Sequence, residues 1–457
     1  MTLRGMSSSL DSAADSLSIG AEPVLRVGVS PPLPVLRFFL AGRYALADVT
    51  VGPGWCRAEP GDQGVVVACE ETSRLLPSPV ILTPCRQAGT FVIPAVPVGA
   101  GFHWNHREDL TYPGSLELVA AGSRALVGVN RVGLEDYLES VISSEMNPCA
   151  PEPFLEAHAV VARSWVLAQL GPPRSVEEAR PPGVDMWEWF DRRNHDLFDL
   201  CADDHCQRYH GQSRKLAAAS QAVRRTRGTA LYAKGAVVDA RFSKCCGGVT
   251  EDFTTAWGGP PPTGLTSVLD ASPLPPEWPH SLTVEAGAVP WIMGFPPAHC
   301  SITDAGILDR ILLPMDRATE HFFRWREEFS QERLASLIEA KTGAGIGSVK
   351  GLKALRRGSS GRIEILEIQG VRGVLRIGKE LAIRRLLSSS HLKSAAFVAM
   401  PGEMIGGIPR QITLTGAGWG HGVGMCQIGA GALAAGGADC AAILNHYFPE
   451  AELAAAY

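Results

Sequence analysis

Residues 134–170 read LEDYLESVISSEMNPCAPEPFLEAHAVVARSWVLAQL, and this stretch decides how the middle of the chain folds. Its first half repeats apolar residues at steps of three and four, which is typical of one face of a helix, and Glu145 falls on that face. The letters NPCAP break the pattern, and Pro151 suits the first turn of a following helix. The sequence therefore predicts helices over 134–146 and 151–170, with a carboxyl group beside the break.

Glu145 is a candidate general acid. A carboxyl group on the buried face of a helix loses solvation, which raises its pKa and favours the protonated form. A carboxyl group that stays protonated near neutral pH is what glycosidic cleavage requires. The pattern alone favours a simpler interpretation, in which this glutamate turns to solvent at the helix end or pairs with Arg163 of the second helix.

The chain upstream of these helices is rich in short runs of β-branched residues broken by Gly and Pro, such as VLRVGV, GVVVAC, SPVILT and TFVIPAV, which predict strands. Because strands and helices are segregated rather than alternating, we expect an α+β fold. The expected organisation is a flexible tail (1–22), a β-rich N-terminal region (23–114) and a mixed α+β region (115–457) that carries the helix-break-helix. A Pro-rich stretch, 171–193, is expected to be an insertion loop.

Composition narrows the class of protein. Hydrophobic residues make up 46% and charged residues 19% of the chain, and the formal net charge is −5, so a sizeable core is expected. There is no block of Lys and Arg, which argues against a nucleic-acid partner. No apolar run reaches the roughly 18 residues of a membrane span, and the first residues lack the apolar segment of a secretory signal, which leaves the compartment open.

Two of the eleven cysteines lie among histidines, in the order His195, Cys201, His205 and Cys206. Two thiolates and one or two imidazoles within a dozen residues fit a tetrahedral zinc site, and two thiolate ligands are typical of a structural one. A local disulfide or reduced core thiols are the alternatives. The letters CCGG at 245–248 indicate a turn with buried thiols rather than a redox pair.

A Gly-rich stretch near the C-terminus, 416–427, reads GAGWGHGVGMCQ. Alternating glycines let a backbone adopt positive φ and approach a ligand closely. Trp419 is suited to stack on a sugar ring, and His421 and Gln427 are suited to bind its hydroxyl groups. The stretch lacks the GKS/T ending of a phosphate loop, and a tight structural turn fits the pattern as well as a site does.

Three segments together resemble one known family. They are LEDYLESVISSEMNPCAPEPFLEAHAVVARSWVLA, FSKCCGGVTEDFTTAWGG at 242–259, and the stretch from GAGWGHGVGMCQ to 453, with CADDHCQRYHG between the first two. Their order and spacing resemble the stage II sporulation protein D family, which includes the amidase-enhancer homologues. The resemblance covers roughly residues 115–457.

The resemblance implies a peptidoglycan lytic transglycosylase that acts on glycan strands stripped of stem peptides, with Glu145 at the position of the catalytic glutamate. Such an enzyme protonates the oxygen between N-acetylmuramic acid and N-acetylglucosamine, and the muramyl 6-hydroxyl then closes on C1 to give a 1,6-anhydro end. Because the substrate supplies the nucleophile, one carboxylic acid suffices. This accounts for the lack of a paired-carboxylate motif in the sequence.

Carried over by resemblance, Arg163 is expected to orient or pair near Glu145. The residues expected to line the glycan cleft are Ser243, Gly247, Gly248, Thr250, Glu251, Trp257, Trp419, His421, Gly422 and Gln427. Zinc binding in parts of the family makes Cys201 and Cys206 the expected ligands, with His195 as the third and His205 as its competitor. One departure is Asn147, which stands where the family commonly has proline directly after Met146.

Two other functions remain open at this stage. One is a glycan-binding or amidase-stimulating module without chemistry of its own, and the other is a zinc-dependent hydrolase, such as an amidase, that uses the Cys/His cluster. The expected partners are peptidoglycan glycan strands and, from the amidase-enhancer homologues, an N-acetylmuramoyl-L-alanine amidase. A cell-envelope or periplasmic location is expected from the substrate.

Overall fold

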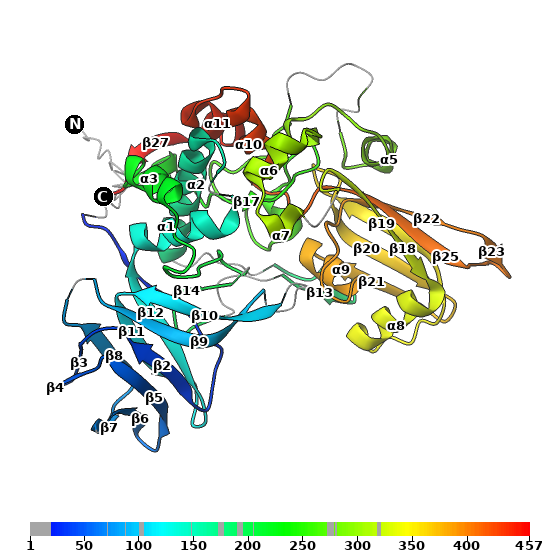
Figure 1. Ribbon diagram of the computed structural model, residues 1–457. Coiled ribbons are helices and arrows are strands. Elements are labelled where there is room, and N and C mark those ends of the chain that lie inside the picture. The colour runs from blue at the N-terminus through cyan, green and yellow to red at the C-terminus, as the bar shows by residue number, and fades with distance from the viewer. Residues whose placement is uncertain are drawn as a thin grey trace, which may run out of the picture.

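A computed structural model describes residues 20–457 except 71, 87, 100–104, 148, 172–177, 190–194, 204, 272–277, 279–280 and 318–320. Residues 1–19 of the expected tail therefore lie outside the described part. The fold is α+β, as predicted. Figure 1 shows a strand-rich part in blue and cyan, a group of helices in teal, green and red, and a yellow and orange lobe built on another sheet.

The strand-rich part, residues 24–133, consists of two packed sheets and is called the sandwich below. Its strands are β1 (Val24–Gly28), β2 (Leu36–Leu40), β3 (Tyr44–Leu46), β4 (Val49–Val51), β5 (Gly54–Gly61), β6 (Gly64–Cys69), β7 (Thr72–Leu76), β8 (Val80–Pro84), β9 (Thr90–Val98), β10 (His106–Pro113), β11 (Ser115–Ala120) and β12 (Leu126–Gly133). The sheet orders are β14-β1-β12-β11-β8-β3-β4 and β10-β9-β2-β5-β6-β7, with β14 being Leu200–Cys201. The last two strands, β11 and β12, form a hairpin that pairs into the same sheet as β1 and β8.

The central helices follow the sandwich without a loop. β12 ends at Gly133 and α1 (Leu134–Glu145) begins at the next residue, so the position of the helix is fixed by the sheet. α2 (Glu152–Leu170) starts after Pro151 and stops before Gly171, and both predicted helices are confirmed. Because these helices and the sandwich share one hydrophobic core, the two parts are packed together.

Other elements surround the two helices. They are α3 (Ala217–Arg225), α10 (Gln427–Ala435), α11 (Cys440–Tyr447), α4 (Phe253–Ala256), η2 (His299–Ser301), α6 (Ala305–Ile311), α7 (Pro314–Arg317), and the strands β15 (Thr229–Ala233), β16 (Ala236–Val237) and β27 (Glu452–Ala455). A short parallel pair, β17 (Phe242–Ser243) with β26 (Met425–Cys426), joins two sequence segments that lie far apart along the chain. This pairing places the CCGG turn beside the Gly-rich stretch.

The yellow and orange lobe has its own core. It contains β18 (Arg324–Ser330), α8 (Gln331–Thr342), β19 (Val349–Arg357), β20 (Ile363–Gly370), β21 (Val374–Gly378), α9 (Glu380–Leu386), β22 (Phe397–Pro401), β23 (Met404–Ile405), β24 (Ile408–Pro409) and β25 (Gln411–Ala417). α8 begins at a Ser330 cap and ends at Gly343, which has a φ of 68°. The described part of the expected insertion, 178–189, adds β13 (Met186–Trp187) to this lobe, parallel to β21.

Three further features complete the fold. Segment 259–300, which has many prolines, contains the helix α5 (Glu285–Met293) with Pro290 inside it. A disulfide joins Cys56 of β5 to Cys69 of β6. In the part of the chain that the structure describes, no helix is both long and apolar enough to cross a membrane.

Candidate active site

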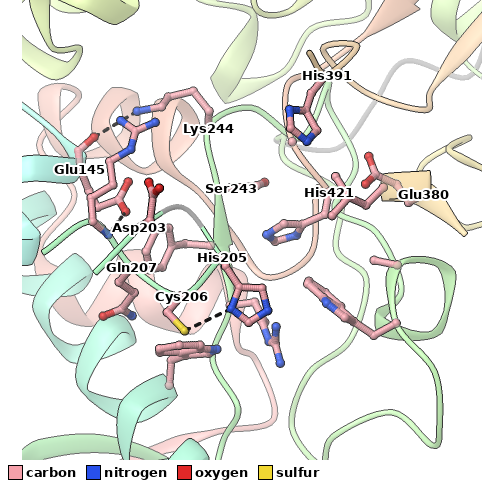
Figure 2. A pocket seen from close by; sticks show the side chains of 18 of the residues that line it. Glu145, Asp203, His205, Cys206, Gln207, Ser243, Lys244, Glu380, His391 and His421 are labelled. Atoms are coloured by element: carbon pink, nitrogen blue, oxygen red, sulfur yellow. Dashed lines mark hydrogen bonds between the residues drawn. The ribbon is translucent and has the colours of Figure 1, made fainter. Parts of the chain in front are cut away.

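A pocket opens where the end of α1, the loop before α3, the β17 segment, the Gly-rich stretch and α9 meet (Figure 2). Six of the residues expected at a glycan site line it, namely Glu145, Ser243, Trp257, Trp419, His421 and Gln427. His195, His205 and Cys206 of the expected metal cluster line the same pocket. The fold thus brings together residues from segments almost 300 positions apart in the sequence, which local patterns alone could not place side by side.

Glu145 is the last residue of α1, and the residue is only 9% exposed. The backbone N–H of Arg208 donates to Glu145 Oε1 at 3.0 Å, which holds the carboxyl group in the pocket wall. Lys244 Nζ donates to the backbone oxygen of Glu145 at 3.1 Å and pairs with Asp316 Oδ2 at 2.8 Å. The helix end and the carboxyl group are therefore both anchored, as a positioned acid requires.

Asn147, the departure from the family's sequence pattern, has its own anchors. Its backbone N–H donates to Ile311 O at 2.9 Å, and its side-chain amide donates to Asp309 O at 2.9 Å. Its Oδ1 accepts from the backbone of Cys149 at 3.0 Å. These bonds tie the chain after α1 to α6, so Asn147 fixes the helix end in place.

Aromatic rings form the opposite wall. The rings of Trp257 and His421 lie 4.8 Å apart edge to face, and the Arg241 guanidinium lies 4.2 Å from the Trp257 ring centre. Asp239 fixes that guanidinium through two hydrogen bonds of 2.9 and 3.1 Å. The ring of Trp419 lines the pocket nearby. Aromatic rings that line a pocket are suited to stacking on a sugar.

His421 is neutral in this setting. Burial lowers its pKa well below the ordinary value, and the nearby charges of Arg241 and Arg362 lower it further. Its Nδ1 accepts a hydrogen bond from the backbone N–H of Val423 at 3.0 Å, so the ring proton is on Nε2. His421 is therefore suited to hydrogen bonding and not to donating a proton as a general acid.

Ser243 and Glu380 each bring a buried polar atom to the pocket. Both side chains are buried, and neither Ser243 Oγ nor Glu380 Oε1 has a hydrogen-bond partner among the described residues. The other oxygen of Glu380 lies 3.5 Å from Arg384 Nη1. A buried polar group without a partner is costly, and a ligand in the pocket would satisfy it.

Glu380 was not found by sequence reasoning. It begins α9, where an acidic residue in the first turn is ordinary, because it interacts favourably with the helix dipole. Its local sequence carries no motif, and it reaches the pocket only through the packing of the lobe against the central helices. No local signal separates it from other helix-start glutamates.

Arg163 does not lie where it was expected, and the prediction that it pairs near Glu145 is wrong. Its guanidinium is fully buried and binds Glu135 with Nε and Nη2, both at 2.8 Å. Glu135 is in the first turn of α1 and Glu145 is its last residue, about 15 Å away along the axis. Arg163 therefore connects α2 to the start of α1. Its Nη1 also donates a hydrogen bond to the backbone oxygen of Thr229, in β15, at 3.1 Å.

The remaining residues that were expected to line the glycan cleft lie behind the residues that line the pocket. Gly247 and Gly248 have φ of 85° and 109°, and Thr250 Oγ1 accepts from the backbone of Val268 at 2.7 Å. A Cβ on Gly422 would meet the Arg362 guanidinium at 2.4 Å. None of Gly247, Gly248, Thr250, Glu251 and Gly422 is among the described residues that line the pocket.

Glu251 is the centre of a buried network. Its Oε2 accepts from Ser360 Oγ at 2.6 Å, and that hydroxyl in turn accepts from Arg362 Nη1 at 2.7 Å. The backbone N–H of Glu251 donates to Gly422 O at 2.9 Å. Burial raises the pKa of Glu251 from 4.5 to about 7, against the opposing effect of Ser360 and Arg362. The network holds the CCGG segment against the Gly-rich stretch.

Because the folded protein keeps a proton on Glu251 that the unfolded chain loses above pH 4.5, this group should lower stability as pH rises from 4.5 to 7. A pKa that rises from 4.5 to about 7 on folding corresponds to about 3 kcal/mol. Urea unfolding at both pH values should show this loss in the wild type and not in Glu251→Gln. The exposed Glu403→Gln should behave like the wild type. An unchanged pH dependence in Glu251→Gln would contradict the assignment.

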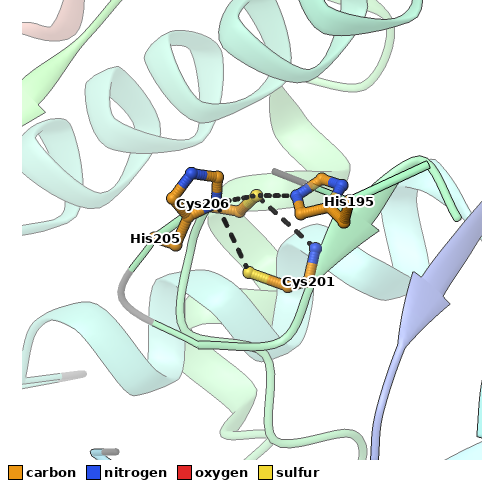
Figure 3. Close-up of side chains that lie close together, drawn as sticks. All are labelled: His195, Cys201, His205 and Cys206. Carbon is orange, nitrogen blue, oxygen red and sulfur yellow. Dashed lines mark hydrogen bonds between the residues drawn. The ribbon is translucent and has the colours of Figure 1, made fainter. Parts of the chain in front are cut away.

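His195, Cys201, His205 and Cys206 lie within reach of one ion, since one ligand atom from each lies within 4.8 Å of the others. Figure 3 shows the four side chains pointing toward a common centre. His195 Nε2 lies 3.3 Å from Cys206 Sγ, and His205 Nδ1 lies 3.5 Å from that sulfur and 3.8 Å from Cys201 Sγ. Two thiols and two imidazoles in this arrangement fit a tetrahedral zinc ion.

Comparison with known proteins agrees with the sequence resemblance over one segment. Residues 123–232 match the family described as Stage II sporulation protein. This match spans α1, α2 and the Cys/His cluster, and it supports membership of that family and a cell-wall-related function. Residues 251–424 match a second family, described as Domain of unknown function (DUF8618). That segment contributes Trp257, Glu380, Trp419 and His421 to the pocket.

An uncharacterized protein of Brachyspira hyodysenteriae is 25% identical to this chain over 339 residues. The aligned part spans 74% of this chain and 71% of that protein. The similarity therefore extends over most of both chains, while the relative's name carries no function.

Proposed function

We propose that this protein is a peptidoglycan lytic transglycosylase that cleaves MurNAc–GlcNAc linkages in peptide-free glycan strands, with Glu145 as the general acid. The observation that carries the proposal is the anchored carboxyl group of Glu145 in a pocket that also holds Trp257, Trp419 and Ser243. The match of residues 123–232 to the stage II sporulation family supports it.

In the proposed reaction, Glu145 gives its proton to the glycosidic oxygen, and the bond between that oxygen and muramyl C1 breaks. The 6-hydroxyl of the same muramyl ring attacks C1 and loses its proton to the Glu145 carboxylate. The products are a 1,6-anhydro-MurNAc end and a GlcNAc end with a free 4-hydroxyl. No water is consumed and the acid is regenerated, so one carboxyl group performs both proton transfers.

The charge of the pocket supports a peptide-free strand as substrate. Five of the residues that line it are Arg or Lys, namely Arg208, Arg241, Lys244, Arg384 and Arg385, of which Arg241 and Lys244 pair with Asp239 and Asp316. The acidic residues of the lining are Glu145, Asp203 and Glu380. Removal of the stem peptide leaves a free lactyl carboxylate on each muramic acid. Guanidinium groups bind carboxylates through paired hydrogen bonds. The arginines that line the pocket are therefore suited to bind the lactyl carboxylates of such a strand.

The test is the product that the wild-type protein makes from amidase-treated glycan strands, identified by mass spectrometry. Anhydro-muramyl ends are expected. Reducing ends without the anhydro ring would instead mean hydrolysis. Binding without any cleavage would favour the alternative of a non-catalytic or amidase-stimulating module.

Glu380 is the specific observation that favours hydrolysis as a second candidate, because it places a second carboxyl group in the pocket. In the transglycosylase, Glu380 only contacts the sugar. Glu380→Gln should then raise KM roughly tenfold with kcat within a few-fold of wild type, since a lost charged hydrogen bond costs on the order of 1.5–3 kcal/mol. A hydrolase that needs both carboxyl groups would instead lose kcat by at least about a hundredfold.

A structural zinc ion at His195, Cys201, His205 and Cys206 is part of the proposal. With four protein ligands the ion has no open position for water, so it would brace the loop rather than do chemistry. That loop leads directly into Arg208, whose N–H holds Glu145. Cys206→Ser should lower the zinc content by one ion per chain, measured by elemental analysis, whereas the exposed Cys149→Ser should not. Equal zinc in both variants would contradict the site.

The proposed location is the cell envelope, where the substrate lies. The disulfide Cys56–Cys69 supports this, because disulfides persist in oxidising compartments. An N-acetylmuramoyl-L-alanine amidase is the proposed functional partner, since it would produce the peptide-free strands that this enzyme cuts.

A further inference from the structure

A second group of side chains of the kinds that bind metals lies outside the pocket. Cys246, Asp270, Cys300 and Cys426 are all buried, and one ligand atom from each lies within 4.8 Å of the others. They come from three separated segments, which are the CCGG turn after β17, the stretch from Asp270 to η2, and the end of β26. The proposed glycan chemistry uses none of them.

The spacing of these atoms suits one ion. Cys246 Sγ lies 3.6 Å from Cys300 Sγ and 3.3 Å from Asp270 Oδ2. In a tetrahedral zinc site with usual bond lengths, neighbouring sulfurs are about 3.8 Å apart, and a sulfur and a carboxylate oxygen are about 3.6 Å apart. The observed distances are within a few tenths of an ångström of these values, so the side chains need little movement to bind.

The surroundings hold these donor atoms in place. Backbone N–H groups donate to sulfur, from Cys246 to Cys426 Sγ at 3.2 Å and from Gly248 to Cys246 Sγ at 3.3 Å. Tyr447 Oη donates to Asp270 Oδ1 at 2.6 Å, which leaves Oδ2 directed at Cys246. Outer hydrogen bonds of this kind orient the ligands of metal sites.

Positive charge lies beside the group. The Arg362 guanidinium is fully buried and donates to the backbone oxygen of Cys246 at 3.0 Å. Three thiolates and a carboxylate around a divalent ion carry a net negative charge, which is costly in a dry interior unless a cation is near. The position of Arg362 is therefore the one that an anionic metal–thiolate centre requires.

We propose that Cys246, Asp270, Cys300 and Cys426 form a second zinc site that binds one Zn²⁺ with four protein ligands. Sulfur donors select a soft ion such as zinc over magnesium or calcium. Binding releases the thiol protons to solvent, and the ion joins the three segments behind the pocket wall that contains Ser243, Lys244 and Gln427. This site is structural, and it does not depend on the proposed glycan cleavage.

The test is a zinc count on the full chain, purified with Zn²⁺ and without chelator, by elemental analysis and native mass spectrometry. The wild type should hold two ions. The double variant C201S/C206S removes the cluster of Figure 3 and should keep one, and adding C300S should remove that ion as well. Cys440→Ser, a free cysteine outside both groups, should keep two.

A second measurement avoids changing buried residues. C201S/C206S reconstituted with Co²⁺ should show the strong sulfur-to-cobalt absorption of a thiolate site, and one equivalent of Zn²⁺ should remove it. One zinc in the wild type with none in folded C201S/C206S would overturn the proposal. So would a disulfide between Cys246 and Cys300, found by peptide mapping of alkylated protein that holds no second ion.

Discussion

Glu145→Gln is expected to reduce the formation of anhydro-muramyl ends from peptide-free glycan by roughly 10²- to 10⁴-fold, the usual contribution of a positioned general acid. The amide cannot donate the proton that the leaving oxygen requires. Its oxygen can still accept the hydrogen bond from Arg208 N–H, so the geometry of the helix end should remain. The measurement is the initial rate of anhydro-product formation by mass spectrometry, with circular dichroism and thermal unfolding to establish that the variant is folded.

Glu139→Gln is the matched control, because it makes the same change in the same helix. Glu139 is also buried, but it accepts from Ser220 Oγ at 2.7 Å and is not among the described residues that line the pocket. Its rate should stay within a few-fold of wild type. A folded Glu145→Gln variant that cleaves as fast as the wild type would exclude Glu145 as the acid and leave Glu380 and Asp203 as the other carboxyl groups among the described residues of the pocket that could donate the proton.

The parts of the fold that the sequence predicted are those set by local rules. Both central helices follow from apolar spacing and from the proline that suits the first turn of the second one. Helix α5, which has Pro290 inside it, is not predicted from the sequence, because a proline normally breaks a helix. Local rules describe an element well but do not say what packs against it.

The same holds for the site, because the residues predicted from sequence are those that a local pattern marks. Trp419, His421 and Gln427 were predicted from one Gly-rich stretch and do line the pocket. Glu380 was missed because it reaches the pocket only through packing of the lobe. The thiols of the CCGG turn were predicted to be buried, and they are, but their association with Cys300 and Cys426 depends on pairings between distant segments. Sequence spacing carries no information on such contacts.

Arg163 lies on a helix that was predicted correctly, but the contact predicted for its side chain is wrong. Helix α1 carries several carboxyl groups, among them Glu135, Glu139 and Glu145, and the sequence alone does not say which of them Arg163 of α2 meets. In the structure Arg163 pairs with Glu135, whose carboxylate also accepts hydrogen bonds from the backbone N–H of Gly228, at 3.2 Å, and from the Tyr457 hydroxyl. Burial alone would raise the pKa of Glu135, but the hydrogen bonds and charge of Arg163 lower it, so the carboxylate is ionised. Arg163 is thus a structural residue.

Arg163→Met should therefore destabilise the protein by about 3–5 kcal/mol, because it leaves the Glu135 carboxylate buried without its counter-charge. The double variant Arg163→Met with Glu135→Leu removes both charges and should recover much of that loss, since an apolar pair of similar volume is often tolerated in place of a buried ion pair. Urea unfolding of the wild type, both single variants and the double variant gives the coupling energy directly. The folded fraction of Arg163→Met should cleave glycan at nearly the wild-type rate, because Glu145 is about 15 Å away along the helix. If Arg163→Met kept wild-type stability but lost activity as Glu145→Gln does, Arg163 would act on the chemistry after all.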